Sequence, residues 1–357
     1  MVTKSLLGTV TTLICVLATA AWAPPAAAHS GAKHCQDETL PVTLPADPIT
    51  YHLYGQLCWQ GTLAGKTVQL LSSGVTYDHT YWDFPLRPQR YSYVRKAVDA
   101  GYATFNIDRL GVGQSDHPPA GSLTVPAEGY VNHQVVQALR HGDLASTAFP
   151  KVIAVGHSFG SGISIYEAGT YADVDGVVVT GFLHALNPDS SNGFFAIIYP
   201  AAEDPKFATA GLPPSYLTTR PGGRAFFYNT SYADPAVIAM DERLKQTTTS
   251  GELATFGLGF DPSLSRRIHV PVLVVTGQRD FSFCNGALSG FSCANSAAVF
   301  ARESFAYAPQ SCLETYVLRR SGHDINLHPD AHLWFERASD WADRRVGASH
   351  QPPCQPC

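Results

Sequence analysis

The stretch from Lys151 to Gly162 decides the fold, and it reads KVIAVGHSFGSG. An apolar run typical of a strand leads into the pattern G-x-S-x-G, and a stretch compatible with a helix follows. A serine on a sharp turn between a strand and a helix has a strained backbone and no room for neighbouring side chains, so glycines must flank it. The pattern G-x-S-x-G is common by chance in a chain with 30 glycines. The apolar strand before it is therefore what makes it evidence for a nucleophile. The stretch predicts Ser158 as a nucleophile.

A serine hydroxyl is a weak nucleophile unless a base removes its proton, so a histidine held by a carboxylate should lie downstream. Asp280 follows the apolar run 272–276, and His323 follows the run 314–318. Because catalytic groups of open α/β sheets gather at the carboxyl ends of strands, we expect both side chains to meet Ser158 there. The order along the chain predicts Ser158 as nucleophile, His323 as general base and then acid, and Asp280 as the group that orients the imidazole.

Other polar and aromatic residues near these loops are weaker candidates. Asp324 is a rival acid, but the side chain next to a histidine rarely points at the same ring, so Asp280 is preferred. His157 is more typical of a packing residue than of an acid or base, and Tyr77 is either an ordinary loop residue or a substrate contact. We retain Tyr77 and His157 as predicted substrate contacts. Two histidines at helical spacing near the last helix lack further ligands, so neither a metal nor a cofactor is expected.

From about residue 50, short apolar runs alternate with stretches whose apolar residues recur at helical spacing. This alternation predicts an α/β fold with a mostly parallel, doubly wound sheet covered by helices on both faces. Several of the predicted strands lack polar alternation, as buried parallel strands do. Strands are expected over 51–59, 67–71, 103–107, 152–155, 176–180, 272–276 and 314–318, and helices over 91–100, 129–140, 162–170, 296–307 and 331–345.

The alternation stops after residue 180 and resumes near residue 269. The intervening stretch is rich in aromatic residues and prolines, and we expect a lid or cap insertion over 185–268, between core segments 29–184 and 269–346. Phe194 and Phe195 are predicted to contact the substrate in an apolar cavity. The alternative is that most of these rings form the small core of the insertion itself.

Four features follow one another along the chain: the loop DRLGVGQS at 108–115, the serine turn, Asp280 and His323. In this order they resemble the α/β-hydrolase superfamily, from about residue 42 to residue 345, and are similar to its lid-bearing esterase and lipase-like branch. The resemblance implies an α/β-hydrolase fold and the triad roles given above. It also implies that the loop at 108–115 is a structural turn.

The resemblance further implies an oxyanion hole made of two backbone N–H groups. One belongs to the residue after the nucleophile, here Phe159, and the other to the loop after the strand at 67–71. Members of the family often carry a His-Gly pair in that loop, where this chain has Ser73 and Gly74. Because the donor is a backbone group, the missing histidine need not abolish the hole, and Val75 is the expected second donor.

Composition limits the kinds of partner. Apolar residues make up 45% of the 357 residues and charged residues 15%, which predicts a compact globule. The formal net charge of -5 leaves no basic excess for nucleic acid or an anionic membrane, so a small molecule is the expected partner. The sequence does not determine the oligomeric state.

The first 28 residues have the pattern of a secretion signal. Lys4 precedes an apolar run at 6–20, and small residues at 26–28 precede His29. The run is shorter than the ~18 to 20 apolar residues that a membrane span needs, and prolines follow it. We therefore expect a cleaved signal peptide and a secreted chain without stable membrane insertion.

Seven of the eight cysteines lie outside this signal, and in an exported chain they predict disulfides. Cys35 and Cys58 could join the N-terminal arm to the first strand. Two of the three cysteines at 284, 293 and 312 are expected to bridge. The Pro-rich tail at 347–357 carries Cys354 and Cys357, for which a structural bridge is preferred to a redox or zinc site. The odd number leaves one thiol unpaired or paired between chains.

Together these features predict a secreted serine hydrolase that cleaves a carboxylic ester or lactone of a small, mainly apolar molecule through an acyl-enzyme. A serine at position 158 disfavours epoxide hydrolases and haloalkane dehalogenases, which use an aspartate nucleophile on the same fold. Peptidases, thioesterases and C–C bond hydrolases use the same triad, so the sequence leaves those reactions open. The alternative is a catalytically idle or non-hydrolytic member with a binding or biosynthetic role.

Overall fold

An eight-stranded sheet forms the centre of the computed structural model, which describes residues 32–45, 47–284 and 292–349. The strand order is β1-β2-β4-β3-β5-β6-β10-β11. β2 runs antiparallel to both β1 and β4, and the other neighbouring strands are parallel. The bounds are β1 (Lys33–Thr43), β2 (Thr50–Gln60), β3 (Thr67–Ser72), β4 (Ala103–Ile107), β5 (Lys151–His157), β6 (Gly176–Thr180), β10 (Val272–Gly277) and β11 (Glu314–Leu318). The predicted mostly parallel sheet is confirmed.

The sequence pattern missed β1, the strand at one edge of this sheet. Its first residues are polar and mostly exposed, and buried apolar side chains appear only at Leu40 and Val42. It pairs with β2 along its whole length. An edge strand needs no continuous apolar run and tolerates Pro41, so the strand lacks the sequence features that reveal the buried ones.

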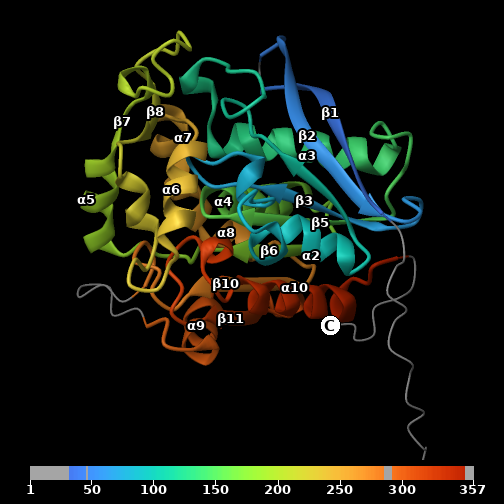
Figure 1. Ribbon diagram of the computed structural model, residues 1–357. Coiled ribbons are helices and arrows are strands. Elements are labelled where there is room, and N and C mark those ends of the chain that lie inside the picture. The colour runs from blue at the N-terminus through green and yellow to red at the C-terminus, as the bar shows by residue number, and fades with distance from the viewer. Residues whose placement is uncertain (1–31, 46, 285–291, 350–357) are drawn as a thin grey trace, which may run out of the picture.

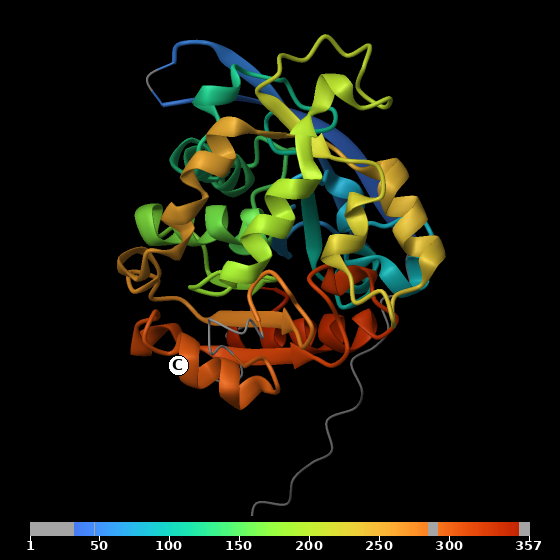
Figure 2. The ribbon, with the colours of Figure 1, turned by 90° about the vertical axis from the view of Figure 1, so that its left-hand side faces the viewer.

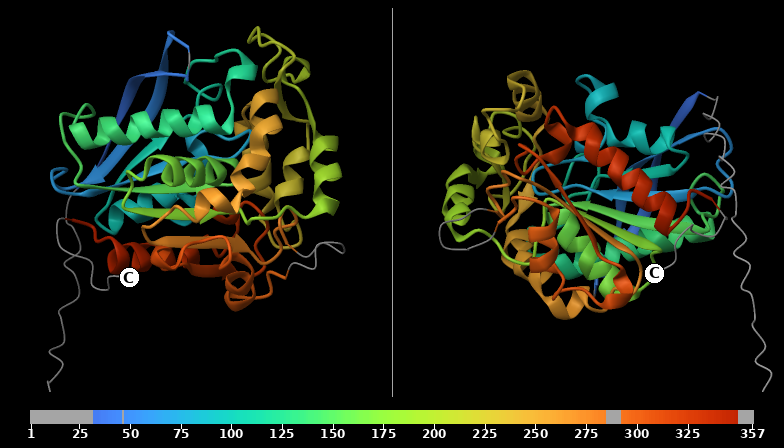
Figure 3. Two further views of the ribbon diagram at one scale, coloured as in Figure 1. Left: turned by 180° about the vertical axis from the view of Figure 1, so that it is seen from behind. Right: turned by 90° about the horizontal axis from the view of Figure 1, so that it is seen from below.

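Helices cover both faces of the sheet (Figure 1; Figure 3, left). α2 packs against α10 on one face, and α3 packs against α4 on the other. Several helix ends differ from the predicted ones. α3 begins at Val125, because Thr124 caps it by accepting from the N–H of Ala127, and α4 begins at Phe159. α9 gives way to a turn after Glu303. The helices are α1 (Pro88–Tyr91), α2 (Tyr93–Asp99), α3 (Val125–His141), α4 (Phe159–Tyr171), α9 (Ser296–Glu303) and α10 (Ala331–Arg345).

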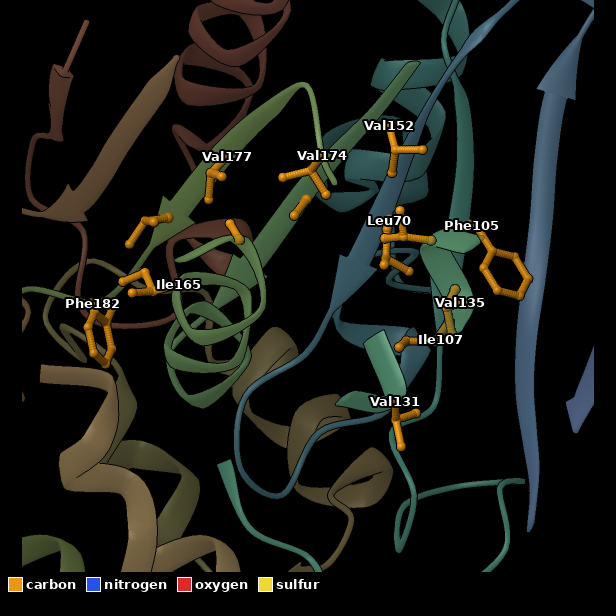
Figure 4. Close-up of a cluster of buried hydrophobic side chains, with 14 of the residues drawn as sticks. Leu70, Phe105, Ile107, Val131, Val135, Val152, Ile165, Val174, Val177 and Phe182 are labelled. Atoms are coloured by element: carbon orange, nitrogen blue, oxygen red, sulfur yellow. The ribbon is translucent and has the colours of Figure 1, made fainter. Parts of the chain in front are cut away.

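The larger apolar core lies between the sheet and the helices α3 and α4. Figure 4 shows Val131 and Val135 of α3 and Ile165 of α4 in one cluster with strand side chains such as Leu70 and Val177. These residues are buried almost completely. Burying one such side chain contributes ~1.5 to 3 kcal/mol, so this layer fixes the strands whose ends carry the site.

The segment between β6 and β10 lies outside the main sheet and has a three-stranded antiparallel sheet of its own. We call its residues 185–268 the insertion. In Figure 2 the insertion faces the viewer, in front of the main sheet. It contains α5 (Pro188–Ile197), β7 (Ile198–Pro200), β8 (Tyr216–Thr219), α6 (Pro235–Leu244), β9 (Thr248–Thr249), α7 (Ser250–Thr255) and α8 (Pro262–Ser265).

Short 3-10 helices complete the described elements. They are η1 (His79–Tyr81), η2 (Ala120–Ser122), η3 (Ala201–Glu203), η4 (Gly223–Phe227), η5 (Phe256–Phe260), η6 (Pro309–Ser311) and η7 (Ile325–Leu327). Among the residues that the structure describes, no helix combines the length and the apolar character that a membrane span requires.

Two disulfides join described cysteines, one in the predicted pair and one in a pairing that the sequence left open among 284, 293 and 312. Cys35 bonds to Cys58 and ties β1 to β2, and Cys284 bonds to Cys293 in the region after β10. Cys312 is also disulfide-bonded. The predicted bridge of the tail and the predicted signal peptide at 1–28 fall outside the described residues.

Candidate active site

Ser158 occupies a strained turn between β5 and α4. Its φ of 53° and ψ of -118° lie in a region that residues with side chains rarely adopt. A Cβ added at Gly156 would lie 2.5 Å from the carbonyl oxygen of Gly160, and one added at Gly160 would lie 2.2 Å from that of Ser72. The glycines of the motif are therefore required by close backbone approaches, which hold the serine at the carboxyl end of β5.

His323 and Asp280 meet in the loops after β11 and β10. The distance from His323 Nδ1 to Asp280 Oδ2 is 3.0 Å, and both side chains are buried. Asp280 Oδ1 accepts a hydrogen bond from the N–H of Ser282. His323 and Ser158 both line one cavity. The structure thus brings the three predicted triad residues to the same edge of the sheet.

The Asp280 carboxylate controls the state of the imidazole. Burial would lower the pKa of His323, but the charge of Asp280 and its hydrogen bond outweigh burial, and the pKa lies above its ordinary value of 6.5. Because a carboxylate can only accept, His323 Nδ1 carries the proton of this bond. Nε2 is then left to act as a base toward a serine hydroxyl.

The two predicted oxyanion donors also lie together. Val75 and Phe159 belong to one apolar cluster, and a Cβ on Gly74 would lie 3.0 Å from Ser158 Cβ, so the loop after β3 touches the nucleophile. Within the described part of the chain, neither the N–H of Val75 nor that of Phe159 donates to a protein acceptor. For Phe159 the reason is its place in the first turn of α4, where N–H groups have no partner in the helix.

The cavity beside Ser158 is walled by apolar side chains from the core and the insertion. The structure places Phe194 and Phe195 in this wall, and their contact with a substrate stays a prediction. Among the lining residues that the structure describes, His323 alone is ionisable. The sequence did not assign Leu186, Leu253, Phe256 and Phe283 to the wall. The wall also contains the rings at 226 and 227 and the serines at 190, 191 and 282. Leu186, Leu253 and Phe256 come from the insertion, which identifies it as the roof over the carboxyl ends of the strands.

Tyr77 and His157 lie behind the cavity and are not among its lining residues. The His157 ring stacks on Tyr81 with centroids 4.3 Å apart, and its centroid lies 4.9 Å from that of His323. Burial lowers the pKa of His157 well below its ordinary value, which keeps the ring neutral. Their direct contact with a substrate stays a prediction.

Asp324, the rival acid, makes its side-chain hydrogen bonds with His157 and Tyr77, whereas Asp280 bonds to His323. Asp324 Oδ1 lies 3.4 Å from His157 Nε2, and its Oδ2 makes a short contact with the Tyr77 hydroxyl, which lies 3.1 Å from Asp241 Oδ2. One phenol proton cannot serve two carboxylates. Burial raises the pKa of Asp324, which is the direction that favours a proton on this carboxyl.

Two groups of side chains have atoms as close as those of a metal site. One consists of His157, His323 and Asp324, and the other of Asp78, His79 and Asp108. In the second group Asp108 accepts from the backbone and the ring of His79 and from a further N–H. In the first group His157 Nε2 lies 3.4 Å from Asp324 Oδ1, while His323 bonds to Asp280 outside the group.

A mostly parallel sheet with a serine turn after β5, an acid after β10 and a histidine after β11 defines an α/β hydrolase. The chain belongs to the alpha/beta hydrolase family, whose model matches residues 70–332. This membership supports hydrolase chemistry at the level of the family. No protein of the curated collection matches the chain.

Similar solved structures share this fold. A soluble variant of monoglyceride lipase from Saccharomyces cerevisiae is 15% identical over 90% of this chain and 99% of that chain, with a TM-score of 0.58. The α/β hydrolase GrgF from Penicillium sp. sh18 is 15% identical over 88% and 99%, with a TM-score of 0.56. A monoacylglycerol lipase from Paleococcus ferrophilus is 15% identical over 81% and 97%, with a TM-score of 0.53.

Proposed function

We propose that the chain is a secreted serine hydrolase that cleaves a carboxylic ester or lactone of a small, mainly apolar molecule. The observation that carries the proposal is the placement of Ser158 and His323 in the wall of one apolar cavity, with His323 bonded to the buried Asp280. Secretion rests on the signal pattern of the first 28 residues and on the disulfides.

In the first half of the reaction, Ser158 Oγ attacks the carbonyl carbon while His323 Nε2 takes the serine proton. The carbonyl oxygen becomes an oxyanion, which the N–H groups of Val75 and Phe159 stabilise. One such donor is worth ~3 to 4 kcal/mol of barrier. His323 then returns the proton to the leaving alcohol as the C–O bond breaks, and the acyl group stays on Ser158.

In the second half, His323 removes a proton from a water molecule, and the resulting hydroxide attacks the acyl-enzyme. The imidazolium returns its proton to Ser158 Oγ, and the carboxylic acid leaves. In a lactone the alcohol remains attached to the acyl group, so a single hydroxy acid is released. The buried carboxylate of Asp280 stabilises the imidazolium in both halves.

The cavity wall supports a neutral, apolar acyl group as the substrate. Aromatic rings at 194, 195, 226, 227, 256 and 283 surround the space beside Ser158. Within the described part of the chain, its polar lining besides Ser158 and His323 consists of serine hydroxyls. A charged acyl group would lose its hydration there without gaining an ionic partner. We propose that the insertion at 185–268 acts as the lid that supplies most of these rings.

A fluorophosphonate probe tests the nucleophile. We expect it to label the wild-type chain and a Ser191→Ala variant, which lacks another serine of the same cavity, but not Ser158→Ala. Initial rates on 4-nitrophenyl esters of increasing acyl length and on lactones then define the substrate. An unlabelled, folded wild-type chain, or full labelling of Ser158→Ala, refutes the proposal.

Ser73 favours a second candidate, a non-hydrolytic protein of this fold, because it replaces the histidine that often marks the oxyanion loop. Such a protein would keep its biological effect when Ser158 is replaced by alanine. Loss of that effect together with ester turnover supports the hydrolase.

A further inference from the structure

The loop from Ser73 to Thr76, which we call the oxyanion loop, lies between two buried arginines. It connects β3 to the residues before η1 and carries Val75, the proposed second oxyanion donor. Arg109 contacts its first half and Arg224 contacts its last residue. Both arginine side chains are at most 1% exposed. The loop is therefore held by charged groups on two sides.

Arg109 fixes the carbonyl groups at the start of the loop. Its Nε donates to the Ser73 carbonyl at 3.0 Å, and its Nη2 donates to the Gly74 carbonyl at 3.2 Å. Its Nη1 pairs with Glu128 of α3 and also with Glu252 of α7. Because α7 belongs to the insertion, this arginine links the loop to both the core and the roof of the cavity.

Arg224 comes from η4 of the insertion and fixes the other end. Its Nη1 donates to the Thr76 hydroxyl at 2.6 Å. Its Nε and Nη2 each lie 3.0 Å from an oxygen of Asp241 in α6, which is a bidentate pair within the insertion. The guanidinium also lies 3.8 Å from the centre of the Tyr77 ring. Two hydrogen bonds to Asp241 thus orient the arginine within the insertion, and a third hydrogen bond goes to the loop.

The backbone of Thr76 is strained and needs contacts that hold it in place. Its φ of 61° lies in the left-handed region, which is unfavourable for a β-branched residue unless the surroundings enforce it. Its carbonyl accepts a hydrogen bond of 2.9 Å from the N–H of Gln246, another residue of the insertion. Two contacts from the insertion therefore hold the residue that directly follows Val75.

We propose that Arg224 and Thr76 are positioning residues through which the docked insertion sets the direction of the Val75 N–H. The inference rests on the proposed function, because it assigns that N–H to the oxyanion hole. When the insertion is docked, the bond from Arg224 to Thr76 holds the left-handed turn, and the hole is complete. The bond from Arg224 to Thr76, together with the bond from Gln246, then couples the roof of the cavity to the catalytic power of the site.

The Thr76→Ala variant removes the hydroxyl that accepts from Arg224, and Thr76→Ser keeps a hydroxyl at the same position. Since loss of a whole oxyanion donor costs ~10² to 10³ in kcat, we expect Thr76→Ala to lower kcat on a 4-nitrophenyl ester about 10-fold to 100-fold with KM nearly unchanged. Thr76→Ser keeps the hydroxyl and should retain most of the activity. Arg224→Lys keeps a positive charge but cannot make the paired bonds, so we expect a loss similar to that of Thr76→Ala.

An alkyl trifluoromethyl ketone separates positioning from folding. It adds reversibly to Ser158: a C–O bond forms, the serine proton passes to His323, and the former carbonyl oxygen becomes an oxyanion that needs the hole. We expect its inhibition constant to rise in Thr76→Ala by the same factor by which kcat falls. Arg140→Lys is the control, since Arg140 is a partly buried arginine that bonds to Asp173 and Asp175 and not to the oxyanion loop.

The outcomes are distinguishable. Unchanged kcat and ketone affinity in Thr76→Ala overturn the inference even if its thermal stability falls, and so does an equal loss in Arg140→Lys. A wild-type chain that turns over no ester and binds no ketone overturns the proposed function and this inference with it. Recovery of both quantities in Thr76→Ser supports the inference.

Discussion

Replacement of Asp280 by asparagine tests the triad through two separate quantities. Asp280 is fully buried, and its Oδ2 accepts the Nδ1 proton of His323 at 3.0 Å. Asparagine fits the same space but removes the charge and can turn a donor toward Nδ1. Where the orienting carboxylate of a serine–histidine–acid triad has been replaced in this way, kcat falls ~10⁴-fold. This factor corresponds to ~5 kcal/mol of barrier.

The same substitution should move the pH profile. Asp280 holds the pKa of His323 above 6.5, and His323 must be neutral to act as a base, so wild-type kcat/KM should fall as the pH drops through a value above 6.5. In Asp280→Asn, burial lowers the pKa of His323 with less opposition. The acid limb should therefore shift to lower pH while the plateau falls.

Rates on a 4-nitrophenyl ester between pH 5 and 9 measure both effects. Asp324→Asn is the matched variant, because Asp324 is equally buried and adjacent in sequence to the histidine but faces His157 and Tyr77. We expect it to lose much less activity than Asp280→Asn. A larger loss in Asp324→Asn, or a plateau that is unchanged in Asp280→Asn, would refute the assignment of the acid.

Three other perturbations probe the scaffold around the site. Gly160→Ala places a Cβ 2.2 Å from the Ser72 carbonyl, so both the melting temperature and ester turnover should fall; a variant with wild-type values of both would contradict the close approach. Burial raises the pKa of Glu128 from 4.5 to about 8, so this group makes the unfolding free energy decline as pH rises through that window. In urea titrations between pH 4 and 9, the unfolding free energy of E128Q should decline less with rising pH than that of the wild type. An identical decline in both would show that Glu128 does not cause it. Replacing Cys284 and Cys293 by alanine should cost ~2 to 3 kcal/mol of stability in the same assay.

The triad could be predicted from the sequence because each of its members follows a buried strand. The apolar runs before Ser158, Asp280 and His323 mark three parallel strands, and such strands end at one edge. Local composition therefore determined both the role and the place of each residue. β1 lacked such a run because one of its sides is open to solvent.

The contacts of the arginines, and the parts of the cavity wall beyond Phe194 and Phe195, could not be predicted, since they join distant parts of the chain. Arg224 and Thr76 are 148 residues apart, and Arg109 and Glu252 are 143 apart. No periodicity relates such pairs; only the packing of the insertion on the core brings them together. Phe283 of the wall likewise depends on how the loop after β10 turns.

The energetic cost of these buried charges argues that they serve the site. Bringing an ion into a protein interior costs several kcal/mol, and apolar residues of similar volume often stabilise a fold as well or better. Around the oxyanion loop, however, two arginines and the carboxyl groups of Glu128, Glu252 and Asp241 are almost completely buried. A guanidinium can offer several donors in a fixed plane, which an apolar side chain cannot do. The loop, which has Ser73 in place of the usual histidine, is held at the Ser73 and Gly74 carbonyls by Arg109 of the core. It is held at Thr76 by Arg224 and Gln246 of the insertion. Both parts of the protein therefore support the Val75 N–H that we propose as an oxyanion donor.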